Sequence, residues 1–205
     1  MLDRLCAVAL LSAVLLSATA PVLAADVEPP KFAQDARNPA PKAALNTFQR
    51  FELAPVAMGA PFAEYETNQV ALTKLQANVD ERVKPVVSEW NARAAGDAPR
   101  TLRLQPEIRY IRFITGGKRF FGGAFAGGSS VHLKVTLTDA ATGEVIAEPD
   151  FYQHANAFGA AWSFGGTDKH MLIRLSAMLA DYLQANYASA VGGAVTVAPG
   201  HDEEK

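Results

Sequence analysis

A strict two-residue alternation near the middle of the chain is the feature that most constrains its fold. Apolar residues occupy every second position of 131–137, and polar residues lie between them. This period predicts a strand with one buried face and one solvated face. The next segment runs from Asp139 to Gly143 and is followed by an apolar pair at 145–146. Aspartate binds its own backbone in turns and glycine tolerates a positive φ, so these residues predict a hairpin.

Two amphipathic helices are predicted, one before the hairpin and one after it. The first has apolar residues three or four positions apart, which places them on one face of a helix. They are Leu72, Leu75, Val79, Val83, Val86 and Trp90. Pro85 removes one hydrogen bond near the end of this helix and predicts a kink there. The closing helix is expected to begin at Thr167 or Asp168, and its stripe contains Leu172, Leu175, Leu179 and either Tyr182 or Leu183.

Three more runs of residues complete the predicted sheet. Segment 51–58 is predicted as a strand at an edge of the sheet or with a bulge, because Pro55 cannot donate to a ladder. Segment 101–114 alternates, with Leu102, Leu104, Ile108 and Tyr110 on one face and Arg103, Glu107 and Arg109 on the other. Segment 147–158 extends the return strand past a bulge at Pro149. The order β-α-β-β-β-α predicts an α/β two-layer sandwich, with one mixed four-stranded sheet backed on one face by two helices.

The first 25 residues have the pattern of a secretory signal peptide. Arg4 precedes an apolar run at 5–16, and small residues surround Ala24 and Ala25, where cleavage is expected. An N-terminal anchor helix is the alternative, although the run is shorter than a spanning helix requires. We therefore expect a periplasmic or secreted mature chain with no transmembrane segment. Processing would remove Cys6, the only cysteine, so no disulfide is expected.

The remaining chain is predicted to form one folded domain between two loose ends. Residues 26–47 contain four prolines among scattered charges, which favours a flexible spacer. Residues 191–205 have a similar composition and predict a flexible tail. The domain then spans 48–190, a length that suits a single core. The net charge of −2 argues against a nucleic-acid partner, which would favour a concentrated basic surface.

Two segments rich in glycine and aromatic residues bracket the hairpin, at 116–128 and 159–168. If their strands are neighbours, both segments leave the sheet at one edge and form a partner-binding surface. The candidate residues are Arg119, Phe120, Phe121, Phe125, Trp162 and Phe164. The alternative is that these rings only cover the core. A second hypothesis places a small anion on the surface arginines Arg109 and Arg112, beside Arg103. A solvated strand face is the favoured explanation, because Glu107 interrupts the basic stripe and charged outward faces are normal.

No recognisable catalytic, metal or cofactor motif is present. Gly123-Ala124 stands where a phosphate-binding loop needs Lys-Ser/Thr, and Ser129-Ser130 does not complete G-x-S-x-G. The histidines His132, His154 and His170 lack the spacing of a zinc site. The sequence therefore predicts no catalytic residues, no metal and no cofactor, although a fold does not by itself exclude an enzyme.

Three motifs resemble a family of bacterial envelope domains of unknown function, whose members are often lipoproteins. The first is a glycine-rich turn after an arginine, at 118–131; the second is the D-x-x-T-G hairpin at 139–145. The third is the helix ending Leu-x-x-Tyr-Leu at 179–183. The resemblance implies an exported α/β domain without assigned activity. This chain departs from the family because it lacks the cysteine of a lipid anchor.

These observations favour an exported, non-catalytic envelope module. Its expected partner is an unknown envelope protein or polymer, bound through the glycine and aromatic segments, and self-association into a homo-oligomer is left open. The alternative function is a small-anion-binding or hydrolytic periplasmic protein that uses surface arginines.

Overall fold

The computed structural model describes residues 27–93, 99–113, 128–155 and 166–197. The main sheet is built from β2 (Arg50–Leu53), β3 (Ala57–Met58), β4 (Thr101–Arg112), β5 (Ser129–Asp139), β6 (Val145–Ala147) and β7 (Asp150–Ala155). The helices are α1 (Glu66–Asn91) and α4 (Gly166–Ala188), with short 3-10 turns η2 (Leu45–Thr47) and η3 (Phe62–Glu64). Two further short strands, β1 (Arg37–Asn38) and β8 (Gly193–Ala194), pair with each other.

The sheet is mixed, as predicted, but it has six strands rather than four. β4 and β5 form its long antiparallel centre. β2 and β3 both pair parallel to β4, and β6 and β7 both pair antiparallel to β5. On each side of the central β4–β5 pair, one predicted strand is therefore split into two short strands. Pro55 lies in the break between β2 and β3, and Pro149 in the break between β6 and β7. Proline cannot donate a ladder hydrogen bond, which explains why the breaks fall at these two positions.

The predicted hairpin is present. Apolar side chains alternate along β5, where Val131, Leu133, Val135 and Leu137 are fully buried. The Asp139 carboxylate accepts a hydrogen bond from the backbone N–H of Ala141 at 2.9 Å, and Gly143 adopts a φ of 75°. Only a residue without a Cβ adopts this left-handed φ at little cost, so Gly143 fixes the turn that returns the chain into β6.

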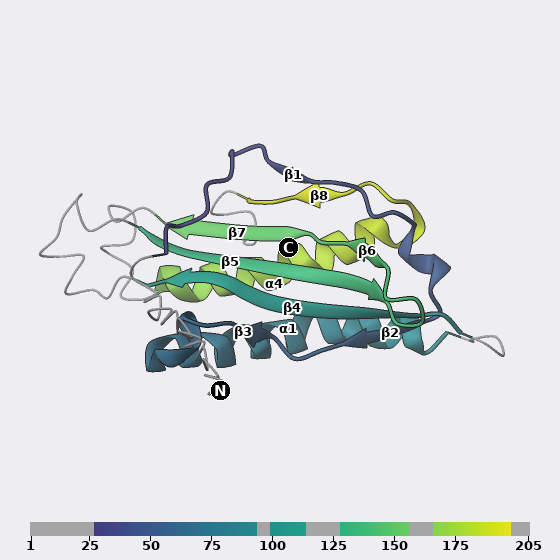
Figure 1. Ribbon diagram of the computed structural model, residues 1–205, viewed down its shortest axis with the longest axis horizontal. Coiled ribbons are helices and arrows are strands. Elements are labelled where there is room, and N and C mark those ends of the chain that lie inside the picture. Colours follow the sequence, from purple (N-terminus) through teal and green to yellow (C-terminus); the bar gives the residue numbers. More distant parts are fainter. Residues whose placement is uncertain (1–26, 94–98, 114–127, 156–165, 198–205) are drawn as a thin grey trace, which may run out of the picture.

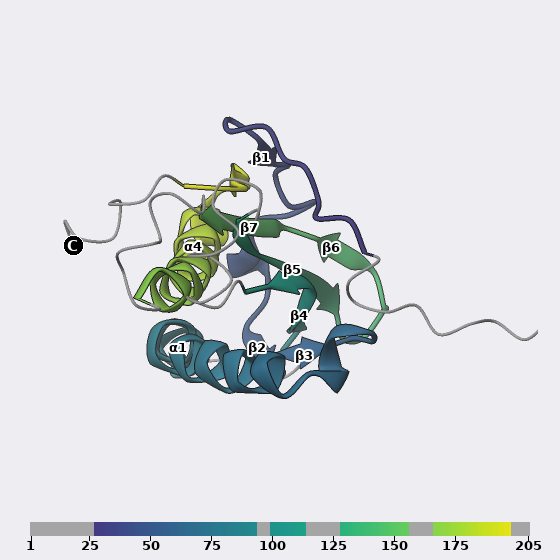
Figure 2. The same ribbon diagram turned by 90° about the vertical axis from the view of Figure 1, so that its left-hand side faces the viewer.

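Both helices lie on the same face of the sheet and contact each other (Figure 1, Figure 2). α1 contacts β2, and α4 contacts β5 and β7. The predicted stripe of α1 is buried at Leu75, Val79, Val83 and Trp90, and the helix continues through Pro85. The two-layer α/β sandwich predicted from the element order is thus confirmed.

The Trp90 side chain lies in the core. Its ring is 5% exposed and stacks on Tyr187 of α4 with 4.4 Å between ring centroids. It also meets Phe51 of β2 at 4.9 Å. Such aromatic contacts add to the apolar area that burial removes from water. Trp90 therefore fastens the end of α1 to both the sheet and α4.

Parts of both predicted loose ends pack against the domain. Residues 193–194 pair with residues 37–38, and Asn38 binds the backbone of Asp150 in β7 through its side-chain amide. Leu45 is fully buried and Val195 is 4% exposed. The prediction of a flexible spacer and tail did not foresee these contacts, because a two-residue strand leaves no periodicity in a proline-rich sequence. The partners of each two-residue strand come from distant parts of the chain.

Candidate functional site

At one end of the sheet, at the left of Figure 1, β4 and β7 end and β5 begins, and the three strands lie side by side. Arg112 of β4 lies opposite Ser130 of β5, and Ser130 lies opposite His154 of β7. Ser129 lies opposite Ala155. These residues flank the two glycine and aromatic segments in the sequence. The points where the segments attach to the sheet are therefore neighbours, which is the condition on which the predicted binding surface depends.

The six partner-binding candidates lie in residues 114–127 and 156–165, outside the described residues. They are Arg119, Phe120, Phe121, Phe125, Trp162 and Phe164. Their role as a binding surface stays a prediction. The anion-binding candidates Arg109 and Arg112, in contrast, both lie in the described part of β4.

A β-bulge at Arg109 separates the two anion-binding candidates. Ile108 lies opposite Leu133 and Tyr110 opposite His132, although those partners are adjacent in β5. Arg109 is thus the extra residue, which is the definition of a bulge. Directly opposed residues share a face, so Tyr110 lies on the outer face with His132. The prediction that Tyr110 shares the buried face of Leu102, Leu104 and Ile108 was wrong, because alternation alone does not reveal the extra residue.

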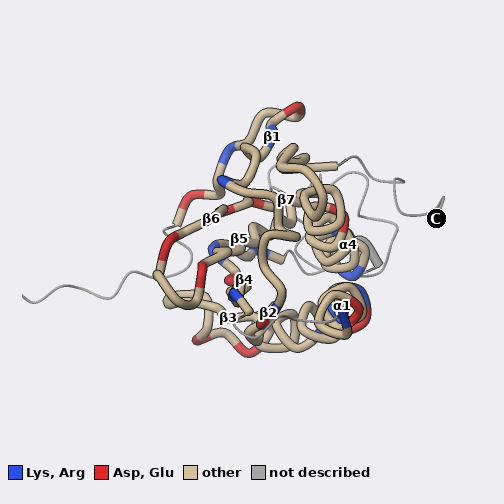
Figure 3. The backbone as a smooth tube through the Cα atoms, turned by 90° about the vertical axis from the view of Figure 1, so that its right-hand side faces the viewer, with Lys and Arg blue, Asp and Glu red and all other residues tan. Residues whose placement is uncertain are grey.

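The arginines of β4 do not form one free basic stripe. The Arg109 guanidinium lies 3.1 Å from the Glu107 carboxylate, and Arg103 lies 3.1 Å from Glu52. Arg112 lies at the end of the strand, next to Tyr110. Basic and acidic positions are interspersed along the strands and α1 (Figure 3). Such exposed pairs contribute little to stability, about 0–1 kcal/mol each. Arg103 and Arg109 are thus each paired with a carboxylate.

The outer face carries a cluster of aromatic and polar side chains near the loop-bearing end. The His132 Nε2 atom lies 2.8 Å from Asp150 Oδ1, with 13% and 29% of the two side chains exposed. Phe32, from the N-terminal segment, covers this pair: its ring centroid is 5.3 Å from those of both His132 and Tyr152. We call Phe32, Tyr110, His132, Asp150 and Tyr152 the outer-face cluster.

Tyr110 is the most enclosed member of the outer-face cluster. It is 3% exposed, and its ring meets Phe62 edge-on at 5.4 Å. Burial raises the pKa of Tyr110, while hydrogen bonds with Arg112 and Ser130 oppose that shift. The phenol therefore stays neutral and keeps its proton available as a hydrogen-bond donor near Arg112.

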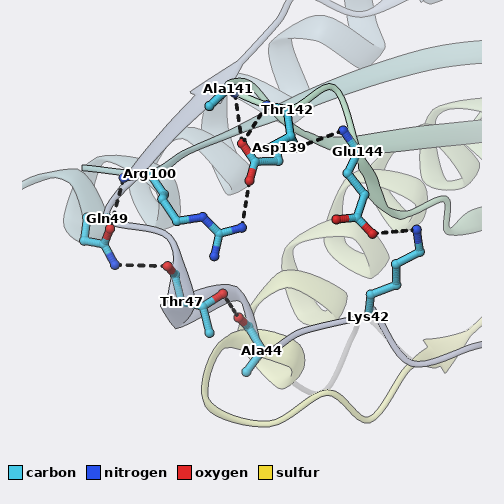
Figure 4. A network of polar contacts seen from close by, with 9 residues as sticks. All are labelled: Lys42, Ala44, Thr47, Gln49, Arg100, Asp139, Ala141, Thr142 and Glu144. Carbon is cyan, nitrogen blue, oxygen red and sulfur yellow. Dashed lines mark hydrogen bonds and ion pairs between the residues drawn. The ribbon is translucent and has the colours of Figure 1, made fainter. Parts of the chain in front are cut away.

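A second polar network holds the opposite end of the sheet (Figure 4). The Asp139 carboxylate accepts a hydrogen bond from Arg100 at 2.7 Å and others from the turn backbone. The Arg100 bond, with the turn N–H groups, holds the pKa of Asp139 below its usual value. Lys42 pairs with Glu144 across the same turn at 2.9 Å. These bonds join the Asp139–Gly143 turn to Arg100 at the start of β4, and Glu144 to Lys42 of the N-terminal segment.

Residues 27–93, 99–113, 128–155 and 166–197 contain no metal-ligand cluster and no helix able to span a membrane. No three His, Cys, Asp or Glu side chains gather there as a metal site would require. Within the same residues, neither helix combines the length and apolarity that crossing a bilayer demands.

The outer-face cluster is the feature that sequence reasoning missed. His132 was placed correctly on the polar face of its strand. Its neighbours Asp150 and Tyr152 come from a strand 18 or more residues later, and Tyr110 reaches this face only through the bulge. The one available signal was the spacing of Asp150, Tyr152 and His154, polar or aromatic residues at every second position.

Comparison with known proteins assigns no family to the chain. No family model and no curated protein matches it. Among solved structures, PelC from Paraburkholderia phytofirmans, a dodecamer, is 13% identical with a TM-score of 0.33, over 69% of this chain and 95% of that one. XCC0632 from Xanthomonas campestris, of family DUF330, is 12% identical with a TM-score of 0.40, over 73% and 93%. The hypothetical protein CT253 from Chlamydia trachomatis is 12% identical with a TM-score of 0.33, over 66% and 98%. Likenesses this distant carry no conclusion about function.

Proposed function

We propose that the protein is an exported envelope module that binds a partner, a protein or an envelope polymer, at the loop-bearing end of its sheet. The observation that carries this proposal is the meeting of three strand ends, with Ser130 opposite both Arg112 and His154. This arrangement anchors both glycine and aromatic segments on adjacent, rigid strands. Binding residues are often presented in this way, on loops fixed by a scaffold.

Export is supported by the residues of the N-terminal segment. A basic start, an apolar run and small residues at a cleavage point are the features of a secretory signal. The mature chain would then begin close to the described segment that carries Phe32. Because Phe32 packs on His132 and Tyr152, that segment lies on the same end of the sheet as the proposed binding surface.

The proposal is tested by replacing residues 120–125 with a Gly-Ser turn of equal length. We expect this variant to lose partner capture in affinity purification from cross-linked cells, while its circular dichroism spectrum and melting temperature stay near those of the wild type. The matched control is a Gly-Ser replacement of residues 94–98. Arg100, two residues after this segment, lies at the opposite end of the sheet, bound to Asp139.

The control variant should capture the same partners as the wild type. Capture that persists in the folded 120–125 variant would contradict the proposal, as would an equal loss in both variants.

A further inference from the structure

We propose that the outer face of the sheet holds an oxyanion-binding site centred on Ser130, between Arg112 and His154. The ligand class is a tetrahedral oxyanion, a phosphate or sulfate group. This site is separate from the two segments proposed to bind the partner, because all of its residues lie in the described strands β4, β5 and β7.

The register of the three strands places these residues in one row. Arg112 lies opposite Ser130, and Ser130 lies opposite His154. Directly opposed residues point to the same face with Cβ atoms about 4.5–5.5 Å apart. The short serine is therefore flanked by two longer side chains that both carry N–H donors. Arg112 and His154 are exposed, whereas Ser130 is 5% exposed.

A second row of opposed residues, which are aromatic, lies beside the first row on the same face. Tyr110, His132 and Tyr152 lie opposite one another in the same three strands. Burial raises the pKa of Tyr110, and hydrogen bonding with Arg112 and with Ser130 opposes that shift, so both side chains lie beside its phenol. Phe32 packs over His132 and Tyr152 and so covers the second row.

The charges of these two rows favour an anion. Neither row contains a carboxylate, as the paired residues of the described strands show. The next row on this face holds two acids, Glu107 and Asp150, on either side of Lys134. Glu107 pairs with Arg109, and Asp150 pairs with His132. The segment that covers the second row carries Glu28, Lys31, Asp35 and Arg37, whose formal charges sum to zero. Among the residues that the structure describes, Arg103 and Arg109 each pair with a carboxylate, and Arg112 does not.

The donor arrangement selects the shape of the ligand. A guanidinium, a serine hydroxyl and an imidazole approach from three different strands. A tetrahedral oxyanion presents oxygens in several directions and can accept from all three, whereas a carboxylate presents two oxygens in one plane. Charge-assisted hydrogen bonds of this kind are about twice as strong as neutral ones, and arginine suits phosphate geometry well.

The test is an NMR titration with inorganic phosphate at constant ionic strength, on protein purified from the envelope of cells that express the full chain. We expect saturable amide shifts confined to residues near 110–112, 129–132 and 152–155. The Arg112→Gln variant should bind phosphate at least about tenfold more weakly, because one charge-assisted contact is lost. His154→Gln should weaken it less, since the amide keeps one N–H donor. The control Arg103→Gln, on the same strand and face, should bind like the wild type.

The proposal is overturned if no saturable shift occurs at these residues, or if Arg112→Gln and Arg103→Gln change the affinity equally. A second arm identifies the source of the phosphate group. Sedimentation with phosphatidylglycerol vesicles, but not with phosphatidylcholine vesicles, in a manner that Arg112→Gln abolishes, assigns the site to a lipid headgroup. Phosphate binding without vesicle binding assigns it to a soluble or polymer-borne phosphate.

Discussion

Replacing Leu137 with alanine is expected to lower the free energy of unfolding by about 2–5 kcal/mol. Leu137 is fully buried at the centre of the sheet, opposite Leu104 of β4 and Ala147 of β6. The substitution removes buried methyl groups between the sheet and the helices, and the surrounding strands can collapse only partly into the space. Because domains of this kind have a total stability of about 5–15 kcal/mol, the loss is a large fraction of it.

Urea denaturation measures this loss as a lower midpoint at an unchanged slope. The matched control is Thr136→Ala, one residue away in the same strand. Thr136 is partly exposed on the outer face, so we expect its substitution to cost less than about 1 kcal/mol. Similar losses for the two variants would show that the assigned faces of β5 are wrong.

Replacing Asn186 with alanine is expected to loosen both ends of the chain and to lower the free energy of unfolding by about 3 kcal/mol. Its side chain is completely buried near the end of α4. The amide oxygen accepts hydrogen bonds from the backbone N–H groups of Val191 and Gly192 at 2.8 Å, and the amide nitrogen donates to the carbonyls of Tyr182 and Gly192. Alanine would leave these backbone groups without their partner.

The effect should spread from the C-terminal segment to the N-terminal one. Gly192 adopts a φ of 77°, and a Cβ there would clash with the Asn38 carbonyl oxygen. The N-terminal and C-terminal segments therefore pass close to each other at Gly192, and Asn186 holds Gly192 in place. Hydrogen exchange should accelerate at residues 193–195 and 36–38 in the variant. The control Gln184→Ala, at an exposed position of the same helix, should change stability by less than about 0.5 kcal/mol. Unchanged exchange at 36–38 would contradict the proposed coupling.

The elements that could be predicted from the sequence are those whose pattern is local. Alternation along 131–137 and the Asp139–Gly143 turn predicted the hairpin, because a half-buried strand and a tight turn each restrict the residue types that fit them. The spacing of apolar residues in α1 predicted its buried stripe for the same reason. These elements depend on nearest neighbours in the chain, and their signal survives without any knowledge of the fold.

The features that were missed depend on distant contacts. The bulge at Arg109 is visible only when β4 is aligned with β5, and it alone brings Tyr110 to the outer face. The strands β1 and β8 have two residues each and exist because Asn38 and Val195 find partners elsewhere in the chain. The candidate site also depends on distant contacts, because Arg112, Ser130 and His154 come from three separate strands. Sequence reasoning selected Arg112 but had no means to find its neighbours.

Photo-cross-linking in living cells tests the central claim most directly. A benzophenone amino acid is placed at Phe125 or Trp162, in the glycine and aromatic segments, and at Val70, an α1 side chain that is 50% exposed. We predict that both segment positions yield the same covalent adduct with one envelope component and that Val70 yields none. An adduct from Val70 equal to those from Phe125 and Trp162, or no adduct from either segment position, would contradict the claim that this end of the sheet binds the partner.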